Sequence, residues 1–400
     1  MDLHLDPQLE TFRAEVRSFI KENLPDDVSY RARKGVHPPR EEDRRRWNKI
    51  LDGKGWAAPG WPKEEGGPGW SPMERQIFEM ECRMGGCPEL RWQGLRLIGP
   101  VIYTFGTPEQ KARYLPKILS GEEQWAQGFS EPEAGSDLAS LRTTAVLEGD
   151  EWVLNGQKLW TSEAYHSDMG FFLCRTKQTP KPQGGISMLL IDMKTPGVTV
   201  RPIQMINGDI STAEVFLDNV RVPKDALLGE AEGGWAQTKF LLGNERTSSA
   251  DIEKTYADLR HIRHIAHQEM KNGKPLIEDK AFRRQLTELS LEAEALDWTV
   301  LRVLSDAPTN FSAGARASVL KLRGSSLQQR ITEFSVTALG QRGLRLFTRE
   351  QAWNPDSVNA DWPEHVPGTT ADMLYARAFT IYGGAMEVQK NIIAKVAFGL

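Results

Sequence analysis

The feature that most constrains the fold is a change of residue pattern that occurs twice along the 400 residues of the chain. Up to about residue 120, and again after Gly233, apolar side chains recur at helical spacing. Between about Gln127 and Val222 the pattern is that of short strands with no helical segment among them. We therefore predict an α+β multi-domain protein: an N-terminal helical domain (1–123), a middle antiparallel β-barrel or sandwich (124–230) and a C-terminal helical bundle (231–400).

Capping residues mark several of the expected helices. Asp6-Pro7 and Ser71-Pro72 are typical helix starts, Thr107 opens a capping box with Gln110, and Gly85-Gly86 ends a helix. Later in the chain we expect one long helix from 235 to about 270, ending at Asn272-Gly273. Further expected segments are helices at 280–304, 312–347 and 387–396 and a loop at 353–368.

The middle segment carries short β-branched or aromatic runs separated by turn residues such as Asn155-Gly156 and Pro196-Gly197. Strands at this spacing without helices between them favour a small antiparallel barrel or sandwich. The expected strands are 143–147, 152–154, 171–175, 186–192, 198–202 and 213–217.

Composition excludes several functions. The net charge is -4, from 50 basic and 54 acidic residues, so no basic surface for nucleic acid is expected. No apolar run reaches the ~18 residues that span a membrane, and the first residues do not resemble a signal peptide, so we expect a cytoplasmic protein. The three cysteines suggest reduced thiols. His261, His264 and His267 share a helix face without partner ligands, so we expect no metal site.

Four segments carry the chemistry. Residues 127–137 read Gln-Gly-Phe-Ser-Glu-Pro-Glu-Ala-Gly-Ser-Asp, and 158–162 read Lys-Leu-Trp-Thr-Ser. Residues 240–246 read Phe-Leu-Leu-Gly-Asn-Glu-Arg, and 381–385 read Ile-Tyr-Gly-Gly-Ala. With the helical, β, helical order, these segments resemble the acyl-CoA dehydrogenase family over essentially the whole chain. The resemblance implies FAD as the cofactor and an acyl-CoA as the substrate. No dinucleotide-binding GxGxxG motif is present.

The resemblance also assigns roles to residues of the first two segments. In the family, the position of Ser130 hydrogen-bonds the flavin ring, the position of Trp160 packs against it and the position of Ser162 contacts its hydride-accepting edge. The position of Ser136 lines the path of the CoA thioester. Alone, a Ser-Glu-Pro turn or a core tryptophan is ordinary, but both in the right order favour a flavin site. The expected cofactor-binding residues are Gln127, Phe129, Ser130, Trp160, Thr161 and Ser162.

The base that removes the α-proton is the point on which activity depends. Many family members carry it as a Glu at the position of Gly383, whose side chain cannot accept a proton, whereas a minority supply it from the helix position of Glu245. We therefore expect Glu245 to be the base. Arg246, which follows it, is expected at the substrate site in a structural or orienting role. The backbone N–H at Gly383 survives the replacement and can still stabilise the developing enolate oxygen. Glu387, one helical turn further on, stays an alternative base.

Two segments depart from the family. Homomeric members bind the far end of FAD through an Arg-x-x-Phe-Gly motif and a Gln-x-x-Gly-Gly-x-Gly motif from a neighbouring subunit. Residues 266–280 contain no such first motif, and Gly340 to Gly343 are only a partial match to the second. The pattern resembles the large subunit of pimeloyl-CoA dehydrogenase and heteromeric bacterial steroid side-chain enzymes. It implies a homologous second subunit in an α2β2 assembly.

The expected reaction is dehydrogenation of an acyl-CoA to a trans-2-enoyl-CoA, with an electron-transfer flavoprotein as the implied electron acceptor. Two alternatives stay open. One is a flavin oxidase or monooxygenase on the same fold, and the other is a non-catalytic partner of an active paralogue. The intact Ser130, Trp160 and Glu245 argue against the second alternative.

Overall fold

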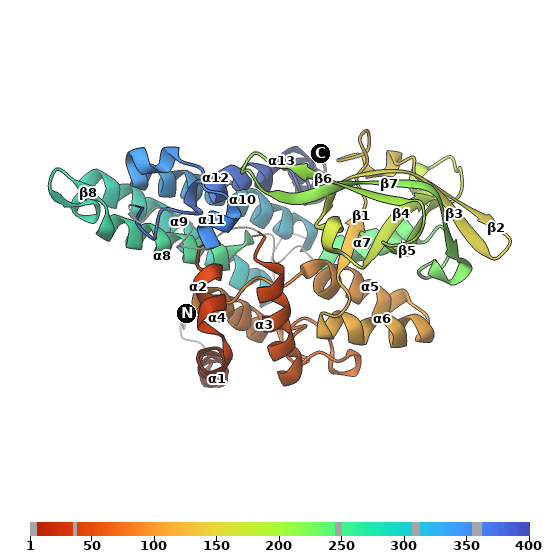
Figure 1. Ribbon diagram of the computed structural model, residues 1–400, viewed down its shortest axis with the longest axis horizontal. Coiled ribbons are helices and arrows are strands. Elements are labelled where there is room, and N and C mark those ends of the chain that lie inside the picture. The colour runs from red at the N-terminus through yellow and green to blue at the C-terminus, as the bar shows by residue number, and fades with distance from the viewer. Residues whose placement is uncertain (1–5, 35–37, 245–249, 306–312, 354–361) are drawn as a thin grey trace.

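The computed structural model describes residues 6–34, 38–244, 250–305, 313–353 and 362–400. Figure 1 shows the expected three parts: a group of N-terminal helices, a twisted sheet at one end of the molecule and a long helical bundle at the other. The N-terminal helices lie along one side, against both of the other parts. The predicted α+β architecture, helical then β then helical, is confirmed.

Predicted caps begin and end the N-terminal helices. The Asp6 side chain accepts from the Gln8 N–H, Ser71 and Thr107 each form a capping box, and Gly86 ends its helix with φ 84°. These helices are α1 (Pro7–Asn23), α2 (Asp26–Ala32), α3 (Glu41–Lys54), α4 (Pro72–Gly85), α5 (Gly99–Phe105) and α6 (Pro108–Ser120).

A single π-helix, unexpected from the sequence, precedes α5 among the residues described. It is η2 (Gln93–Ile98), and the Gly99 N–H bonds the carbonyl of Gly94, five residues back. The Trp61 indole N–H donates to the Leu95 carbonyl at 2.6 Å, and the six-membered part of the Trp61 ring lies directly against Gly99. One extra residue in a helical turn shifts the faces of the side chains that follow, and such turns are frequent at functional sites.

The middle part is one curled sheet, in which seven strands are paired within the described residues. The strand order is β1-β4-β2-β3-β7-β6, with β5 beside β4. Pairing is antiparallel as predicted, except for the parallel pair β1–β4 and a single parallel β2–β4 contact. The strands are β1 (Trp125–Gly128), β2 (Thr144–Glu148), β3 (Glu151–Ser162), β4 (Met169–Arg175), β5 (Ile186–Asp192), β6 (Val198–Gln204) and β7 (Ile210–Pro223).

The C-terminal helices correct one prediction. The expected single helix over 235–270 is wrong, because α7 (Gly234–Asn244) and α8 (Ile252–Gln268) are separate helices. Asp251 has a left-handed φ of 45°, which cannot continue a helix.

Asn272 and Gly273, both at positive φ, turn a small hairpin of β8 (Met270–Lys271) and β9 (Lys274–Pro275). The other helices are α9 (Lys280–Leu304), α10 (Ala313–Leu339), α11 (Arg349–Trp353), α12 (Thr369–Tyr375) and α13 (Met386–Phe398).

The expected helix over 312–347 ends instead at Leu339, because Gly340 turns to φ 54° and opens a 3-10 turn. Among the described helices, none is both long and apolar enough to cross a bilayer. The 3-10 turns are η1 (Lys63–Glu65), η3 (Leu138–Ser140), η4 (Ala164–His166), η5 (Pro182–Gly185), η6 (Lys224–Ala226), η8 (Leu276–Glu278), η9 (Gly340–Leu344) and η11 (Ala376–Thr380).

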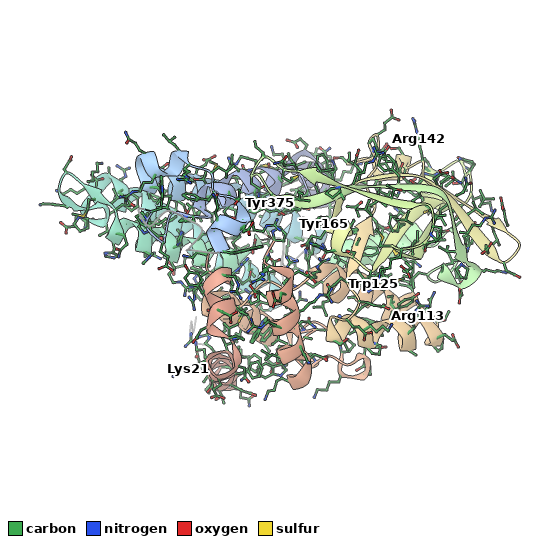
Figure 2. The ribbon with its side chains drawn as sticks, viewed as in Figure 1. Lys21, Arg113, Trp125, Arg142, Tyr165 and Tyr375 are labelled. Atoms are coloured by element: carbon green, nitrogen blue, oxygen red, sulfur yellow. The ribbon has the colours of Figure 1, made fainter. Side chains whose placement is uncertain are left out.

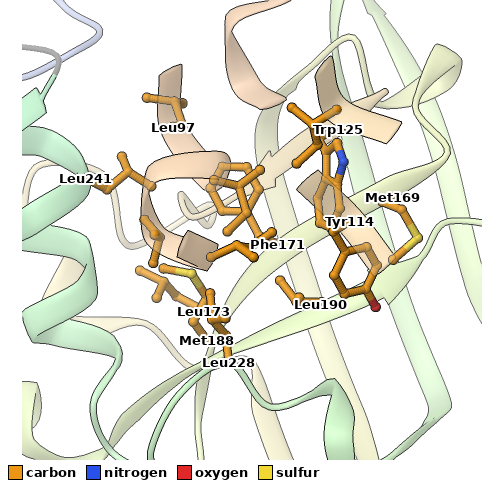
Figure 3. Close-up of a cluster of buried hydrophobic side chains, with 14 of the residues drawn as sticks. Leu97, Tyr114, Trp125, Met169, Phe171, Leu173, Met188, Leu190, Leu228 and Leu241 are labelled. Atoms are coloured by element: carbon orange, nitrogen blue, oxygen red, sulfur yellow. The ribbon is translucent and has the colours of Figure 1, made fainter. Parts of the chain in front are cut away.

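One core joins the N-terminal helices to the sheet. Figure 3 shows Trp125 and Phe171 of the sheet packed with Leu97 of the π-helix and Leu241 of α7, all of them buried. A second core fills the C-terminal bundle. Tyr165, which follows β3, and Tyr375 of α12 lie toward the middle of the molecule in Figure 2, whereas Arg142 lies on the outer side of the sheet.

The close packing of the Trp61 ring on Gly99, at the end of the π-helix, predicts that Gly99→Ala is destabilising. A methyl group there would lie 2.1 Å from the Trp61 ring and 2.8 Å from the Gly94 carbonyl oxygen, so ring and backbone must move. Overpacking of this kind costs about 1–3 kcal/mol. The matched control is Gly53→Ala in α3, where no atom lies within 4 Å of the added methyl group. We expect the thermal unfolding midpoint to fall for Gly99→Ala and to hold or rise for Gly53→Ala. Equal midpoints would contradict this account.

Candidate active site

A buried ion pair holds together the two segments expected to contact the flavin. Lys158 of β3 is fully buried, and its Nζ lies 2.7 Å from Glu131 Oε1. The same Nζ donates to the carbonyl oxygens of Leu173 at 2.7 Å and Phe129 at 3.3 Å. The Glu131 carboxylate also accepts the N–H groups of Arg142 at 2.6 Å and Thr143 at 3.0 Å. Both charged groups thus have a counter-charge and further hydrogen-bond partners, which a buried ion pair needs to offset the loss of water.

Ionisation of the pair reflects these contacts. Burial alone would raise the pKa of Glu131, but the Lys158 charge and the hydrogen bonds at the carboxylate outweigh it and hold that pKa below its usual value. Burial lowers the pKa of Lys158, and the Glu131 charge opposes that shift. The pair therefore binds the turn that carries Ser130 to the strand that carries Trp160 and Ser162.

The strand itself is distorted at Trp160. Lys158 pairs with Val215 and Thr161 with Ala213, so β3 has one residue more than β7 between these pairs. In this bulge Trp160 has φ 59° and its side chain is 56% exposed. The Leu159 N–H donates to the Ser130 carbonyl oxygen at 2.8 Å. The Trp160 ring thus projects from the sheet beside Ser130. The backbone of Trp160 has a conformation that a non-glycine residue rarely adopts.

A second buried ion pair follows the strand end. Glu163, directly after Ser162, has φ 52°, and its two carboxylate oxygens accept from Arg44 Nη1 of α3 at 2.7 and 2.8 Å. Both side chains are buried. Because this contact joins the N-terminal helices to the end of β3, it fixes the position of Ser162.

The other predicted flavin residues lie on the same segments. Gln127 pairs with Phe171 across β1 and β4 and is partly buried, and the buried Phe129 ring makes an edge contact with Phe171 at 5.6 Å. Thr161 is fully buried, and its hydroxyl oxygen has no hydrogen-bond partner among the described residues. Thr161 therefore faces the sheet interior, whereas Trp160 faces outward. Ser136 is exposed in the segment after the Ser130 turn.

Gly383 lies in a loop built by two left-handed residues, with φ 64° at Gly383 and 92° at Gly384. Its N–H makes no hydrogen bond to any residue that the structure describes. The ammonium of Lys321, on α10, lies 4.9 Å from the centre of the Tyr382 ring and would lie 3.4 Å from a Cβ at Gly383. Glu387 is exposed in the first turn of α13. Glu245 and Arg246 lie outside the described residues.

Sequence reasoning missed both buried ion pairs. The sequence did carry a signal for Lys158. It lies four residues after the buried Leu154, so in one strand both side chains lie on the same, inward face. A lysine is rarely buried there without an acidic partner. No comparable signal marked Glu163 or Arg44. Among the described residues, no group of three His, Cys, Asp or Glu side chains is arranged to hold a metal ion.

The residues present fit an isoalloxazine ring. An exposed indole stands beside the partly accessible hydroxyl residues Ser130 and Ser162, and the buried ion pairs hold all three rigidly. An aromatic face next to polar donors is the environment that orients a flavin and tunes its electronics.

Comparison with known proteins supports this reading. The chain matches the acyl-CoA dehydrogenase N-terminal domain over residues 6–122, the middle domain over 126–220 and the C-terminal domain over 232–398. Acyl-CoA dehydrogenase IpdE1 of Mycobacterium tuberculosis is 36% identical, with 98% of each chain covered. The chain belongs to the acyl-CoA dehydrogenase family, whose members are FAD-dependent flavoproteins.

Two solved structures share the fold over the full length. One, described as the Tcur3481-Tcur3483 steroid ACAD, has a TM-score of 0.84 at 30% identity and covers 100% of this chain and 99% of its own. The ChsE4-ChsE5 complex from Mycobacterium tuberculosis has a TM-score of 0.82 at 30% identity, with the same coverage. Both names describe assemblies of two different chains.

The buried pair predicts that Lys158→Met is severely destabilising. Removal of one partner leaves the Glu131 carboxylate buried without its counter-charge, which costs about 3–5 kcal/mol. We expect a lower thermal midpoint and loss of bound FAD. Lys117→Met is the matched control, since Lys117 makes a similar 2.9 Å contact with Glu123 but is 40% exposed. That variant should change neither midpoint nor FAD content, because exposed pairs contribute little. Similar losses in both variants would contradict the role of burial.

Proposed function

We propose that this chain catalyses FAD-dependent α,β-dehydrogenation of an acyl-CoA thioester to a trans-2-enoyl-CoA, as the base-carrying subunit of a heteromeric enzyme. The observation that carries the proposal is the bulge at Trp160, which presents an aromatic ring beside the Ser130 turn. Strain of this kind persists in proteins where function requires it, and the two buried ion pairs on either side maintain it.

FAD, when bound, supplies the acceptor for the hydride that leaves the β-carbon. Trp160 would pack against the flavin ring, Ser130 would hydrogen-bond the ring, and Ser162 would contact its hydride-accepting edge. Gln127, Phe129 and the backbone of Thr161 shape the surface beneath it. These roles follow the family resemblance, and the common edge on which Ser130, Trp160 and Ser162 lie supports them.

At the thioester, one group stabilises the carbonyl oxygen and another removes the α-proton. The Gly383 N–H donates to the carbonyl oxygen, where negative charge develops as the α-proton leaves, and Ser136 lines the approach of the thioester. Glu245 takes the α-proton, and Arg246 orients the substrate. The Gly383 N–H makes no hydrogen bond within the part of the chain that the structure describes, which supports the first role. The absence of a side chain at 383 also leaves room for a bulky acyl group, in line with relatives named as steroid ACADs.

The proposed second subunit is a homologous chain in an α2β2 assembly. The names of the two full-length structural relatives support a heteromer. The C-terminal helix supports it independently, because α13 carries no buried residue among those described, although its sequence is rich in apolar residues. Val396 and Phe398 of α13, and Leu400 just after it, are between 51% and 85% exposed, which suits burial against another chain. We propose an electron-transfer flavoprotein as acceptor and a cytoplasmic location.

Replacement of the base gives the first test of the proposed reaction. Glu245→Gln keeps the size of the side chain and removes its basicity, so we expect anaerobic bleaching of the flavin by acyl-CoA to slow by about 10²–10⁴-fold with FAD still bound. Glu387→Gln is the matched control at the alternative base and should bleach at the wild-type rate. Unchanged bleaching in Glu245→Gln, or loss only in Glu387→Gln, would overturn the assignment of the base.

The shared cofactor site gives a second test. Purified alone, the chain should hold FAD far below one equivalent, because the far end of the cofactor lacks the residues that a partner supplies. Co-expression with a homologous chain encoded beside it should restore FAD to about half of the polypeptides, one per αβ pair. The measurement is the ratio of flavin to protein absorbance after gel filtration. Full occupancy in a pure homomer would defeat the heteromer proposal.

A further inference from the structure

A lysine ammonium lies beside the Gly383 loop, and none of the roles proposed above uses it. Lys321 of α10 is half-buried, and its Nζ lies 4.9 Å from the centre of the Tyr382 ring. A Cβ built on Gly383 would lie 3.4 Å from this Nζ and 3.8 Å from the Lys321 Cε. Because a Cβ is one bond from the backbone, the ammonium is no more than about 5 Å from the Gly383 Cα. A positive charge thus stands next to the backbone of the loop.

The backbone that leads into Gly383 is held in place. The N–H groups of Ile381 and Tyr382 both donate to the Ala378 carbonyl oxygen, at 2.9 and 3.0 Å. The ammonium lies over the Tyr382 ring, and the electron-rich face of an aromatic ring attracts a cation at this distance. This contact orients the end of the Lys321 side chain toward the loop.

Hydrogen bonds also join α10 to the turn before the loop. Gln329 of α10 donates from Nε2 to the carbonyl oxygens of Ala376 at 3.1 Å and Arg377 at 3.3 Å. The same atom lies 3.2 Å from the Thr380 hydroxyl oxygen, and Arg377 Nη2 donates to the Gln329 carbonyl oxygen at 3.2 Å. Beyond the loop, α13 packs along α10 (Figure 1). The helix that carries Lys321 therefore contacts the elements on both sides of the Gly383 loop.

Removal of the α-proton creates a charge that a lysine can stabilise. The α C–H bond breaks, the proton goes to the carboxylate base, and the electron pair moves into the thioester carbonyl, whose oxygen becomes negative. On the proposed function this oxygen accepts from the Gly383 N–H. A backbone N–H carries a partial charge, whereas an ammonium a few ångströms away carries a full one. Because the thioester is neutral and the enolate is negative, the ammonium favours the enolate over the bound substrate.

We propose that Lys321 supplies positive charge that stabilises the enolate oxygen, alongside the Gly383 N–H. The inference rests on the proposed function, which puts the thioester oxygen at Gly383. Glycine at this position belongs to the same arrangement, because any side chain there would begin 3.4 Å from the ammonium, in van der Waals contact with it. A loop residue without a side chain leaves the ammonium next to the backbone at which the oxygen binds.

The test isolates enolate formation from the rest of the reaction. The wild-type complex, loaded with FAD and with its partner chain, is first given straight-chain, dicarboxylic and ring-bearing acyl-CoAs, and the one that bleaches the flavin fastest is chosen. Its 3-thia analogue has sulfur in place of the β-carbon, so the α-proton can leave but no hydride can follow. An electron-rich enolate stacked on the oxidised flavin absorbs at long wavelength, and this band is followed as the pH is raised.

Neutralisation of Lys321 should make the enolate harder to form. For Lys321→Met we expect the pH at which half of the bound analogue is deprotonated to rise by about 1–3 units, the range for loss of an opposite charge a few ångströms away. Lys321→Arg keeps the charge and should stay close to the wild type. Arg323→Met is the matched control, since Arg323 lies two residues further along α10 and is 68% exposed. It should leave the midpoint unchanged.

A second ligand separates this effect from a change in the shape of the site. The thioether in which a CH₂ group replaces the thioester carbonyl has no oxygen to stabilise. Its affinity, measured by calorimetry, should therefore be equal in the wild type and in Lys321→Met. Thermal midpoints and FAD content show whether each variant is intact, and Lys321→Gln, which is also neutral, replaces Lys321→Met if that variant does not fold.

The outcomes separate this inference from the proposed function. If an acyl-CoA bleaches the wild-type flavin but Lys321→Met keeps the wild-type midpoint, the role of Lys321 is wrong and the proposed reaction stands. The same holds if Lys321→Met weakens binding of the thioether, or if Lys321→Arg shifts the midpoint as far as Lys321→Met does. If no acyl-CoA bleaches the wild-type flavin, the proposed reaction falls and this inference falls with it.

Discussion

The candidate active site depends above all on the buried contact between Lys158 and Glu131. Each group would be costly to bury alone, and each is surrounded by hydrogen-bond partners from β4 and from the segment before β2. The pair connects β3, β4 and the segment before β2 at one point and fixes the Ser130 turn against β3. The bulge at Trp160 follows two residues later, so the strained backbone there is supported by a contact that cannot move without exposing a charge. The Arg44–Glu163 pair is a second buried ion pair, and it holds the end of β3 against α3.

Local rules predicted most of the fold. Capping boxes at Ser71 and Thr107 and the turn at Pro196-Gly197 depend on a few adjacent residues, and the structure has them where these signals placed them. The turn expected at Asn155-Gly156 is wrong, because both residues lie inside β3, paired with Thr144 and Leu217. The failures are places where the conformation of one residue decides the outcome. The left-handed Asp251 directly precedes α8, and one additional residue makes the π-helix before α5. Both depend on the conformation of the backbone, which the spacing of apolar residues does not report.

The candidate site divides in the same way. Ser130, Trp160 and Ser162 stand in compact motifs and could be found by reading the chain. The partners that hold them are separated by 27 positions for Lys158 and Glu131 and by 119 for Arg44 and Glu163. Pairings of that range follow from the tertiary fold, and a single sequence carries no trace of which carboxylate meets which cation. Similarly, the burial of Thr161 depends on the bulge, which reverses the alternation expected of a strand.

The conformation of the Gly383 loop gives a physical reason to separate the base from the oxyanion donor. At φ 64° any residue with a side chain is strained, whereas the backbone N–H makes no hydrogen bond to a described residue. The loop is thus suited to donate a hydrogen bond and poorly suited to present a carboxylate. On the proposed chemistry the carboxylate comes from the chain between α7 and α8. Helix α10 packs against α8, η11 and α13 and so relates the two sides.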